Sequence, residues 1–213
     1  MTWVRDNWTD VFPLALSHAL LAGIPLLVGL LLAIPLGWAA RRWARAYPVI
    51  VTTSGLLYTI PSLALFILMP LILGTRILDP VNVVAAMTVY TVALLVRTVA
   101  DGLGAVPDHV QASATAMGYG RLRRFFAVEL PLAVPVITAG LRVAAVSNVS
   151  IVSVASLIGV SQLGDLLVDG FNRNIPGELV LGIVASVALA LVFDVAISRT
   201  GRALTPWTRT AAA

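Results

Sequence analysis

The side chains that could support catalysis or metal binding are few and scattered. The sequence has no cysteine, and its two histidines, His18 and His109, lie far apart. Disulfides and cysteine-ligated metals are therefore excluded, and a histidine-based metal site is disfavoured. No Ser/His or His/Glu arrangement and no GxxxxGK[ST] phosphate-binding loop occurs. We expect no catalytic residue, no metal site and no ATP hydrolysis by that route in this chain.

The composition indicates a membrane protein. Of the 213 residues, 59% are hydrophobic and only 11% are charged, whereas about 25% are charged in soluble domains. All 14 basic residues are arginines, and the formal net charge is +4. A net positive charge could indicate that a protein binds nucleic acid. Arginines that anchor membrane loops explain it better, so we expect a lipid environment and no nucleic acid.

Five apolar stretches are long enough to cross the hydrocarbon core, which takes about 20 helical residues. They cover residues 13–40, 48–73, 81–100, 132–158 and 178–197. The sequence therefore predicts an all-α membrane protein of about five transmembrane helices, in one domain over residues 1–213. Prolines interrupt several spans. Pro61 is the best candidate for a hinge or a gate, because Tyr58, Thr59 and Ser62 place polar groups around it.

Arginines predict the orientation, because cytoplasmic loops carry more of them than external loops do. An external N-terminus and an internal C-terminus put nine arginines inside and three outside. The inner set is Arg41, Arg42, Arg45, Arg121, Arg123, Arg124, Arg199, Arg202 and Arg209, against Arg5, Arg76 and Arg173 outside. Arg97 and Arg142, near the inner ends of two spans, are expected to snorkel to lipid phosphates or to pair with Asp101, Glu129 or the ATPase subunit. Asp194 is expected at the same interface, beside Arg199.

The polar segment 101–129 lies inside by the same count. It reads as a small-residue helix, a glycine turn, a basic amphipathic helix and a proline-started span. Asp108 could cap the first helix, and Gly118 or Gly120 could end it with a positive φ. A short helix with small side chains outside the membrane suits docking into a groove of another protein.

This segment resembles the EAA loop of binding-protein-dependent ABC importer permeases, on Gly118 and Leu130-Pro131. In that family the loop holds the coupling helix, which inserts into the nucleotide-binding subunit. The resemblance implies a MetI-like permease fold with a coupling loop over about 101–130. Aligned on Gly118, Ala112 stands where the motif has its glutamate, so the groove contact is expected to be less polar. The coupling role is thereby carried onto Ala112, Ser113, Ala114, Met117, Gly118, Arg121, Arg124, Glu129 and Pro131.

A second resemblance narrows the substrate. The run Ile60-Pro61-Ser62-Leu63-Ala64-Leu65 is similar to a signature of osmoprotectant permeases, and residues 129–142, 157–159 and 163–167 fit that family as well. The similarity covers roughly residues 15–195. It implies the permease subunit of an ATP-driven importer of glycine betaine, choline, carnitine or proline betaine. A permease of the same fold for another solute, such as methionine, stays the alternative.

The resemblance also implies partners. These are a second permease subunit, identical or different, a cytoplasmic ATPase that binds ATP and magnesium, and an external solute-binding protein. The chain itself is expected to hold no cofactor and to be a multi-pass protein of a bacterial-type cell membrane. A membrane enzyme would need convergent catalytic groups, and a secondary carrier would show repeats or charges within the spans. Neither pattern is evident in the sequence.

Two further groups of polar residues are candidates for function. A translocation path is predicted at Tyr58, Pro61, Ser62, Ser147, Asn148 and Ser150, although the small residues of the fourth span could equally serve close helix packing. In the outer segment, Gly164, Asp165 and Asp169 form either a solvated loop or a docking surface and external gate. His18 is expected to be a packing residue with satisfied hydrogen bonds.

Overall fold

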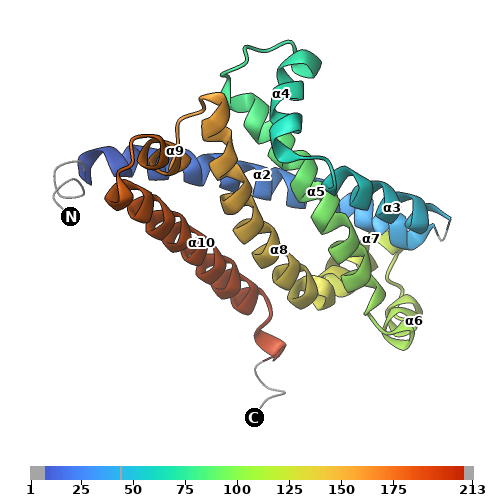
Figure 1. Ribbon diagram of the computed structural model, residues 1–213. Helices are drawn as coiled ribbons and strands as arrows, with labels where there is room; N and C mark the ends of the chain where they lie inside the picture. Colours follow the sequence, from blue (N-terminus) through green and yellow to red (C-terminus); the bar gives the residue numbers. More distant parts are fainter. Residues whose placement is uncertain (1–7, 44, 209–213) are drawn as a thin grey trace.

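The computed structural model describes residues 8–43 and 45–208, and these residues form helices without strands. Four helices are long: α2 (Trp8–Arg42), α5 (Pro80–Gly104), α8 (Leu130–Val152) and α10 (Pro176–Leu204) (Figure 1). The shorter ones are α3 (Ala46–Tyr58), α4 (Ser62–Leu73), α6 (Asp108–Ala116), α7 (Arg121–Arg124) and α9 (Gly164–Asn172). A π-helix covers Phe125–Glu129, and 3-10 turns cover Ser153–Ile158 and Pro206–Thr208.

Helix α5 is the centre of the bundle and packs against α2, α3, α4 and α8. Asp79 caps its N-terminus by accepting a hydrogen bond from the Val81 amide at 3.0 Å, and Pro80 occupies its first turn, where the missing N–H costs nothing. One apolar cluster lies around Phe66 and Met87 and another around Leu95 and Val99. The core therefore follows α5 along its length.

Two glycines let α2 approach α5 closely. A Cβ on Gly29 would lie 2.6 Å from the Cβ of Thr91, and one on Gly37 would lie 2.6 Å from a γ-carbon of Val99. Both glycines are buried. Small residues at such crossings are the usual means by which membrane helices pack.

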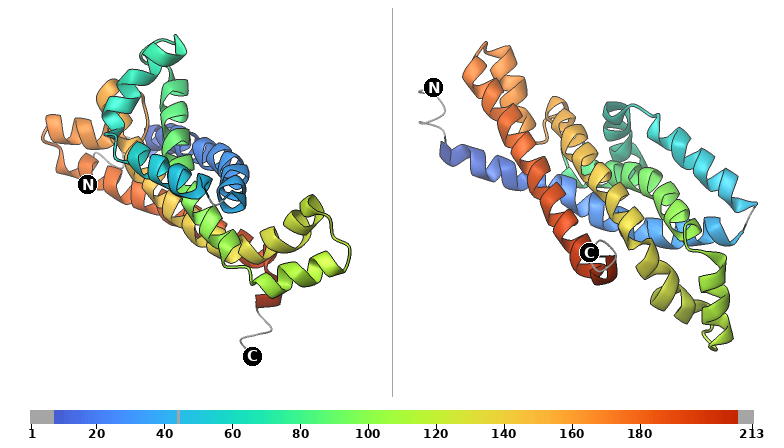
Figure 2. Two further views of the ribbon diagram at one scale, coloured as in Figure 1. Left: turned by 90° about the vertical axis from the view of Figure 1, so that its right-hand side faces the viewer. Right: turned by 90° about the horizontal axis from the view of Figure 1, so that it is seen from below.

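The second expected span is broken. Its two halves, α3 and α4, meet at an angle of 102° across residues 59–61, and in Figure 2 they lie in different directions. Pro61 is extended (ψ 130°) and precedes the first residue of α4, so the helix cannot run through it. The stretch 48–73, expected as one span with a hinge or gate at Pro61, thus consists of two helices that meet at that proline.

The outer segment contains a helix that the sequence did not predict. Helix α9 covers Gly164–Asn172 and packs against α10. The fourth span also changes character, because α8 ends at Val152 and continues as a 3-10 turn to Ile158. Gly159 follows with a φ of 82°, which closes the turn.

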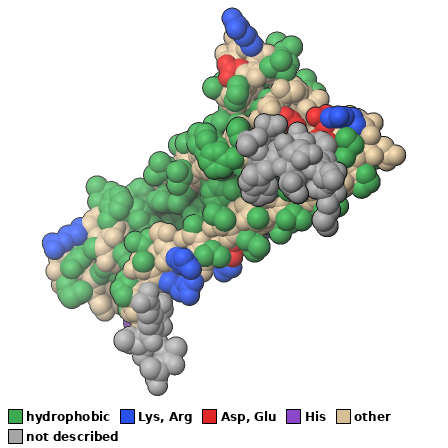
Figure 3. Space-filling view, turned by 90° about the vertical axis from the view of Figure 1, so that its left-hand side faces the viewer, with side chains coloured by type: hydrophobic (Ala, Val, Ile, Leu, Met, Phe, Trp, Pro, Cys, Tyr) green, Lys and Arg blue, Asp and Glu red, His purple; other side chains and the backbone are tan. Residues whose placement is uncertain are grey.

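The surface is that of a membrane protein. Four described helices are long and apolar enough to cross a membrane, or five spans if the bent pair α3–α4 counts as one. Hydrophobic side chains cover a broad band in Figure 3, with charged side chains chiefly toward its ends. Arg5 and Arg209, which entered the orientation count, lie outside the described residues. The orientation stays a prediction.

Candidate functional site

The short helix α6 projects with α7 beyond the ends of α5 and α8 (Figure 2). Its C-terminus is closed by a Schellman turn: the Tyr119 amide donates to the Ala114 carbonyl at 3.1 Å, and the Gly118 amide to the Thr115 carbonyl at 3.0 Å. Gly118 has a φ of 83°, whereas Gly120 has an ordinary φ of −65°. Of the two glycines proposed to end this helix, Gly118 does so. At the other end Pro107, and not Asp108, occupies the cap position.

One face of α6 is open. Ala112, Ser113 and Met117 are exposed, and Met117 retains 69% of its surface, while Ala114 turns inward and is buried. No atom lies within 4 Å of a Cβ built on Gly118, so the turn too is free on its outer side. These residues offer a nearly smooth surface on which another protein could rest.

Arg124 ties this helix to the base of α8. Its Nε donates to Glu129 Oε1 at 2.6 Å, and its Nη1 donates to Thr115 Oγ1 at 2.9 Å. Glu129 is buried and Arg124 is half-buried. The pair is a charge-assisted contact that fixes the end of α6 relative to the start of α8. Glu129 was a candidate partner for the arginines of the spans, and it pairs with Arg124 instead.

Between α7 and α8 the helix widens into a single π-turn. The Leu130 amide donates to the Phe125 carbonyl, five residues back. Pro131 follows directly; it has no N–H to give, and its ring crowds the carbonyl of the preceding turn. A π-turn relieves that crowding without ending the helix. The π-turn thus accommodates Pro131, and α7 continues into α8 as one uninterrupted helix.

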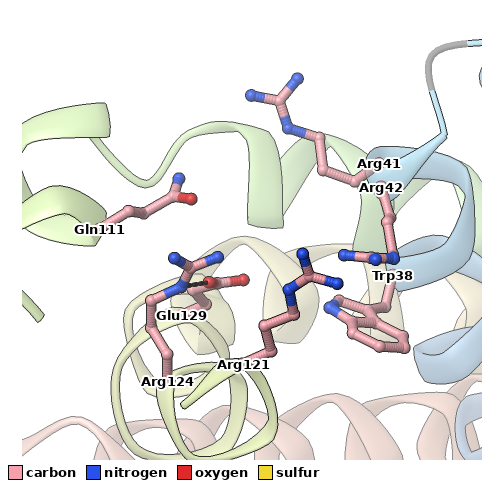
Figure 4. A pocket seen from close by; sticks show the side chains of 7 residues that line it. All are labelled: Trp38, Arg41, Arg42, Gln111, Arg121, Arg124 and Glu129. Atoms are coloured by element: carbon pink, nitrogen blue, oxygen red, sulfur yellow. Dashed lines mark hydrogen bonds and ion pairs between the residues drawn. The ribbon is translucent and has the colours of Figure 1, made fainter. Parts of the chain in front are cut away.

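A pocket of about 270 Å³ opens beside this joint (Figure 4). Side chains of α2 and α7 project into it from opposite walls, and Arg124 turns toward Glu129 at its side. Arg121, one of the expected coupling residues, therefore faces α2 and not the open face of α6. The pocket is lined by Trp38, Arg41, Arg42, Gln111, Arg121, Arg124 and Glu129.

The residues next to Pro61 contact Tyr90 of α5. The Tyr58 ring meets the Tyr90 ring edge-on, with centroids 5.7 Å apart, and the Tyr90 hydroxyl donates to the Ile60 carbonyl. Tyr90 is buried, whereas Tyr58 and Pro61 are exposed and Ser62 is half-buried. Breaking a helix frees carbonyls that need a donor within the protein. Tyr90 provides that donor, and the path role of Tyr58, Pro61 and Ser62 stays a prediction.

Asn148 lies inside the protomer. Its amide nitrogen donates to Thr91 Oγ1 at 2.9 Å and to the Ala22 carbonyl at 3.2 Å, so it links α8 to α5 and α2. This placement fits the packing interpretation of the polar series. Ser147 is half-buried and Ser150 is exposed, and their part in a path stays a prediction.

The outer segment is anchored by a buried network. His18, fully buried, lies between Gln162 Oε1 (2.7 Å from Nδ1) and the Val149 carbonyl (2.9 Å from Nε2). Gln162 in turn accepts from the Gly164 amide at 2.6 Å and donates to the Val152 carbonyl at 3.1 Å. His18 is therefore a packing residue with hydrogen-bond partners, as expected.

The three outer candidates are not equivalent. Gly164 is buried and begins α9, and a Cβ there would collide with the Ser153 carbonyl. Asp165 accepts a hydrogen bond from Ser161 Oγ at 2.6 Å, while Asp169 is exposed. Gly164 thus has a structural task, and a docking or gating role for Asp165 and Asp169 stays a prediction.

The two arginines that were expected near the inner ends of spans both form ion pairs, although Arg142 lies near the middle of α8 (Leu130–Val152). Arg97 lies 3.6 Å from Asp101 on its own helix, and Arg142 on α8 pairs with Asp194 on α10. The expectation that Asp194 lies beside Arg199 was wrong, because Arg142 takes both of its oxygens. Sequence reasoning missed this pair and also Gln162. Both join residues far apart in the chain, and the signal available was an isolated polar residue in an apolar run.

Comparison with known proteins agrees with this architecture. The family described as "Binding-protein-dependent transport system inner membrane component" matches residues 25–210. A glycine betaine/carnitine/choline transport system permease protein of Bacillus subtilis (strain 168) is 28% identical and covers 97% of this chain and 94% of its own. An osmoprotectant import permease protein of Salmonella typhimurium is 30% identical and covers 96% of both chains.

A solved structure supports the fold. A chain of the MetNI methionine ABC transporter in an inward-facing conformation has a TM-score of 0.81, and the match covers 92% of this chain and 96% of that one. The two are 18% identical, so the likeness shows the fold alone. The expected MetI-like permease fold is confirmed. The chain belongs to the family of binding-protein-dependent transport system inner membrane components.

Proposed function

We propose that this chain is the transmembrane permease subunit of an ATP-driven importer of compatible solutes such as glycine betaine, choline, carnitine or proline betaine. The observation that carries the proposal is the match of nearly the whole chain to a Bacillus subtilis permease named for glycine betaine, carnitine and choline and to a Salmonella typhimurium permease named for osmoprotectants. The methionine alternative has support from the fold only, at 18% identity. The chain forms part of the translocation pathway and leaves ATP hydrolysis to a separate subunit.

Helix α6 is the proposed contact for that ATPase subunit. Its open face, its fixed Schellman turn and the Arg124 link to α8 support this assignment. A push on α6 would reach α8 through a short, charge-assisted contact and a continuous helix, without a flexible loop between them. ATP and magnesium would be bound by the ATPase, and the solute would arrive on an external binding protein.

The test is uptake by proteoliposomes that contain this chain with its companion permease, ATPase and binding protein. Radiolabelled glycine betaine, choline, carnitine, proline betaine and methionine are offered in parallel, with and without internal ATP. ATP-dependent accumulation of a quaternary ammonium solute supports the proposal. Accumulation of methionine alone would favour the alternative, and ATP-independent uptake would contradict the assignment to an ATP-driven importer.

A further inference from the structure

The pocket between α2 and α7 holds more positive charge than the surrounding acids neutralise. Four of its lining residues are arginines and one is an acid. Glu129 is already paired with Arg124. Within the described chain, no carboxylate lies within 4.0 Å of the guanidinium groups of Arg41, Arg42 or Arg121. Like charges held in one concavity repel each other unless an anion lies between them.

The position of the pocket indicates where that anion comes from. Arg41 and Arg42 lie in the last turn of the apolar helix α2. One turn earlier, the Trp38 ring packs on the Phe125 ring, with ring centroids 5.4 Å apart. Indoles at the end of a span typically lie at headgroup depth. The pocket therefore opens at the level where a membrane presents its phosphates.

Apolar side chains surround the charged ones at this level. Leu122 and Phe126 are 64% and 63% exposed, and Trp43, directly after α2, is 58% exposed. Leu122 and Phe126 are four residues apart and share one face of the helix, whereas Arg121 and Arg124 line the pocket. A basic face beside an apolar face is the pattern of a segment that lies in the membrane interface.

We propose that this pocket binds the phosphodiester headgroup of an anionic lipid. Guanidinium forks match the two free oxygens of a phosphodiester, and the Gln111 amide and the Trp38 N–H add neutral donors for a glycerol headgroup. The cavity volume of about 270 Å³ accommodates a phosphate and a small polar headgroup. The acyl chains extend past Leu122 and Phe126.

A lipid fits this pocket better than an acidic loop of the ATPase. The exposed residues Ala112 and Ser113 of α6 and Met117 after it lie outside the pocket, and only Gln111 from that helix lines it. The bound phosphate would hold the end of α2 to α7 and so brace the root of the coupling loop. The site is independent of which solute the assembly imports.

The test is lipid binding by the purified full-length chain in a neutral detergent, measured by native mass spectrometry. The probes are dioctanoyl phosphatidylglycerol, dioctanoyl phosphatidylcholine and free glycerol phosphate. Each basic residue near an anionic headgroup contributes about fivefold to affinity. We therefore expect Arg41→Gln with Arg121→Gln to weaken phosphatidylglycerol binding about thirtyfold.

The matched control removes the same charge elsewhere, with Arg45→Gln and Arg199→Gln, neither of which lines the pocket. That variant should bind phosphatidylglycerol like the unaltered chain. Equal weakening in both double variants, or equal affinity for phosphatidylcholine, would overturn the proposal. Binding of glycerol phosphate as tight as that of the lipid would also overturn it, because the site would then be one for a free anion. Circular dichroism verifies that every variant is helical.

Discussion

The guanidinium of Arg142 on α8 donates two hydrogen bonds to the carboxylate of Asp194 on α10, from Nε to Oδ1 at 2.7 Å and from Nη2 to Oδ2 at 2.8 Å. Helix α10 is the least buried of the long helices within this chain. It contacts α8 and α9 extensively and α2 only slightly. The ion pair is therefore a principal polar contact between α10 and the rest of the bundle.

Breaking this pair should loosen α10. Arg142→Gln and Asp194→Asn are each expected to lower the unfolding temperature in detergent slightly, because each breaks a two-pronged but partly exposed ion pair, and exposed pairs contribute little to stability. The double variant should be more stable than either single one. Arg97→Gln is the control, since the pair that it breaks is more exposed and longer, at 3.6 Å. A double variant no better than the worse single one would argue against a fastening role.

The Schellman turn at Gly118 gives a second prediction. Gly118→Ala places a side chain at a φ of 83°, which costs about 1–2 kcal/mol, and this strain should redirect α6. We expect the assembled importer to keep ATPase activity but to lose most of its solute uptake. Gly120→Ala is the matched control, because Gly120 has a φ of −65° and open space around it. The two activities are measured on the same proteoliposomes. Equal uptake by the two variants would count against the role of the turn.

Tyr90 is predicted to hold the bend between α3 and α4. Tyr90→Phe removes the hydroxyl that donates to the Ile60 carbonyl, at a cost of about 1–3 kcal/mol for the carbonyl left without a donor. The chain has no cysteine, so spin labels placed at Thr52 and Ile72, both exposed, report the bend without background. The distance distribution between them should broaden in the variant. An unchanged distribution would contradict the prediction.

Close packing of α2 on α5 makes Gly29 sensitive to substitution. Gly29→Ala places a Cβ 2.6 Å from that of Thr91, and Thr91 also bonds Asn148. Such overpacking should cost about 1–3 kcal/mol, measured as a lower unfolding temperature. Gly55→Ala on α3 meets nothing within 4 Å and should be neutral or slightly stabilising. Similar temperatures for both variants would mean that the crossing tolerates a wider separation.

Features set by neighbours in the chain could be predicted from the sequence. The length of apolar runs located the long helices, the proline after Ile60 located the break, and the glycine at 118 located the end of α6. Each depends on backbone geometry within a few residues. The size of the bend between α3 and α4 could not be predicted, because the contact of Ile60 with Tyr90 of α5 holds it.

Features set by distant residues could not be predicted. Arg142 and Asp194 are 52 positions apart, and His18 and Gln162 are 144 apart. A single sequence identifies each as a polar group that needs a partner, but not which partner. Asn148 illustrates the same limit: a buried amide needs hydrogen-bond partners, but the partners Thr91 and Ala22 follow only from the packing of three helices.

The buried network around His18 has a mechanical consequence. It fastens α2, α8 and the start of α9 to one another, and Asn148 adds α5 to the same body. Within the described residues, the α3–α4 pair is attached to α5 by two separate hydrogen bonds, from the Tyr47 hydroxyl to Asp101 at 2.8 Å and from the Tyr90 hydroxyl to the Ile60 carbonyl at the bend, and not by a buried network that links several helices. The molecule is therefore expected to consist of a rigid part, formed by α2, α5, α8 and the start of α9, and a more mobile pair of helices, α3 and α4. When the transporter changes conformation, α2, α5, α8 and the start of α9 should move together as one rigid body, while α3 and α4 change their mutual angle at residues 59–61.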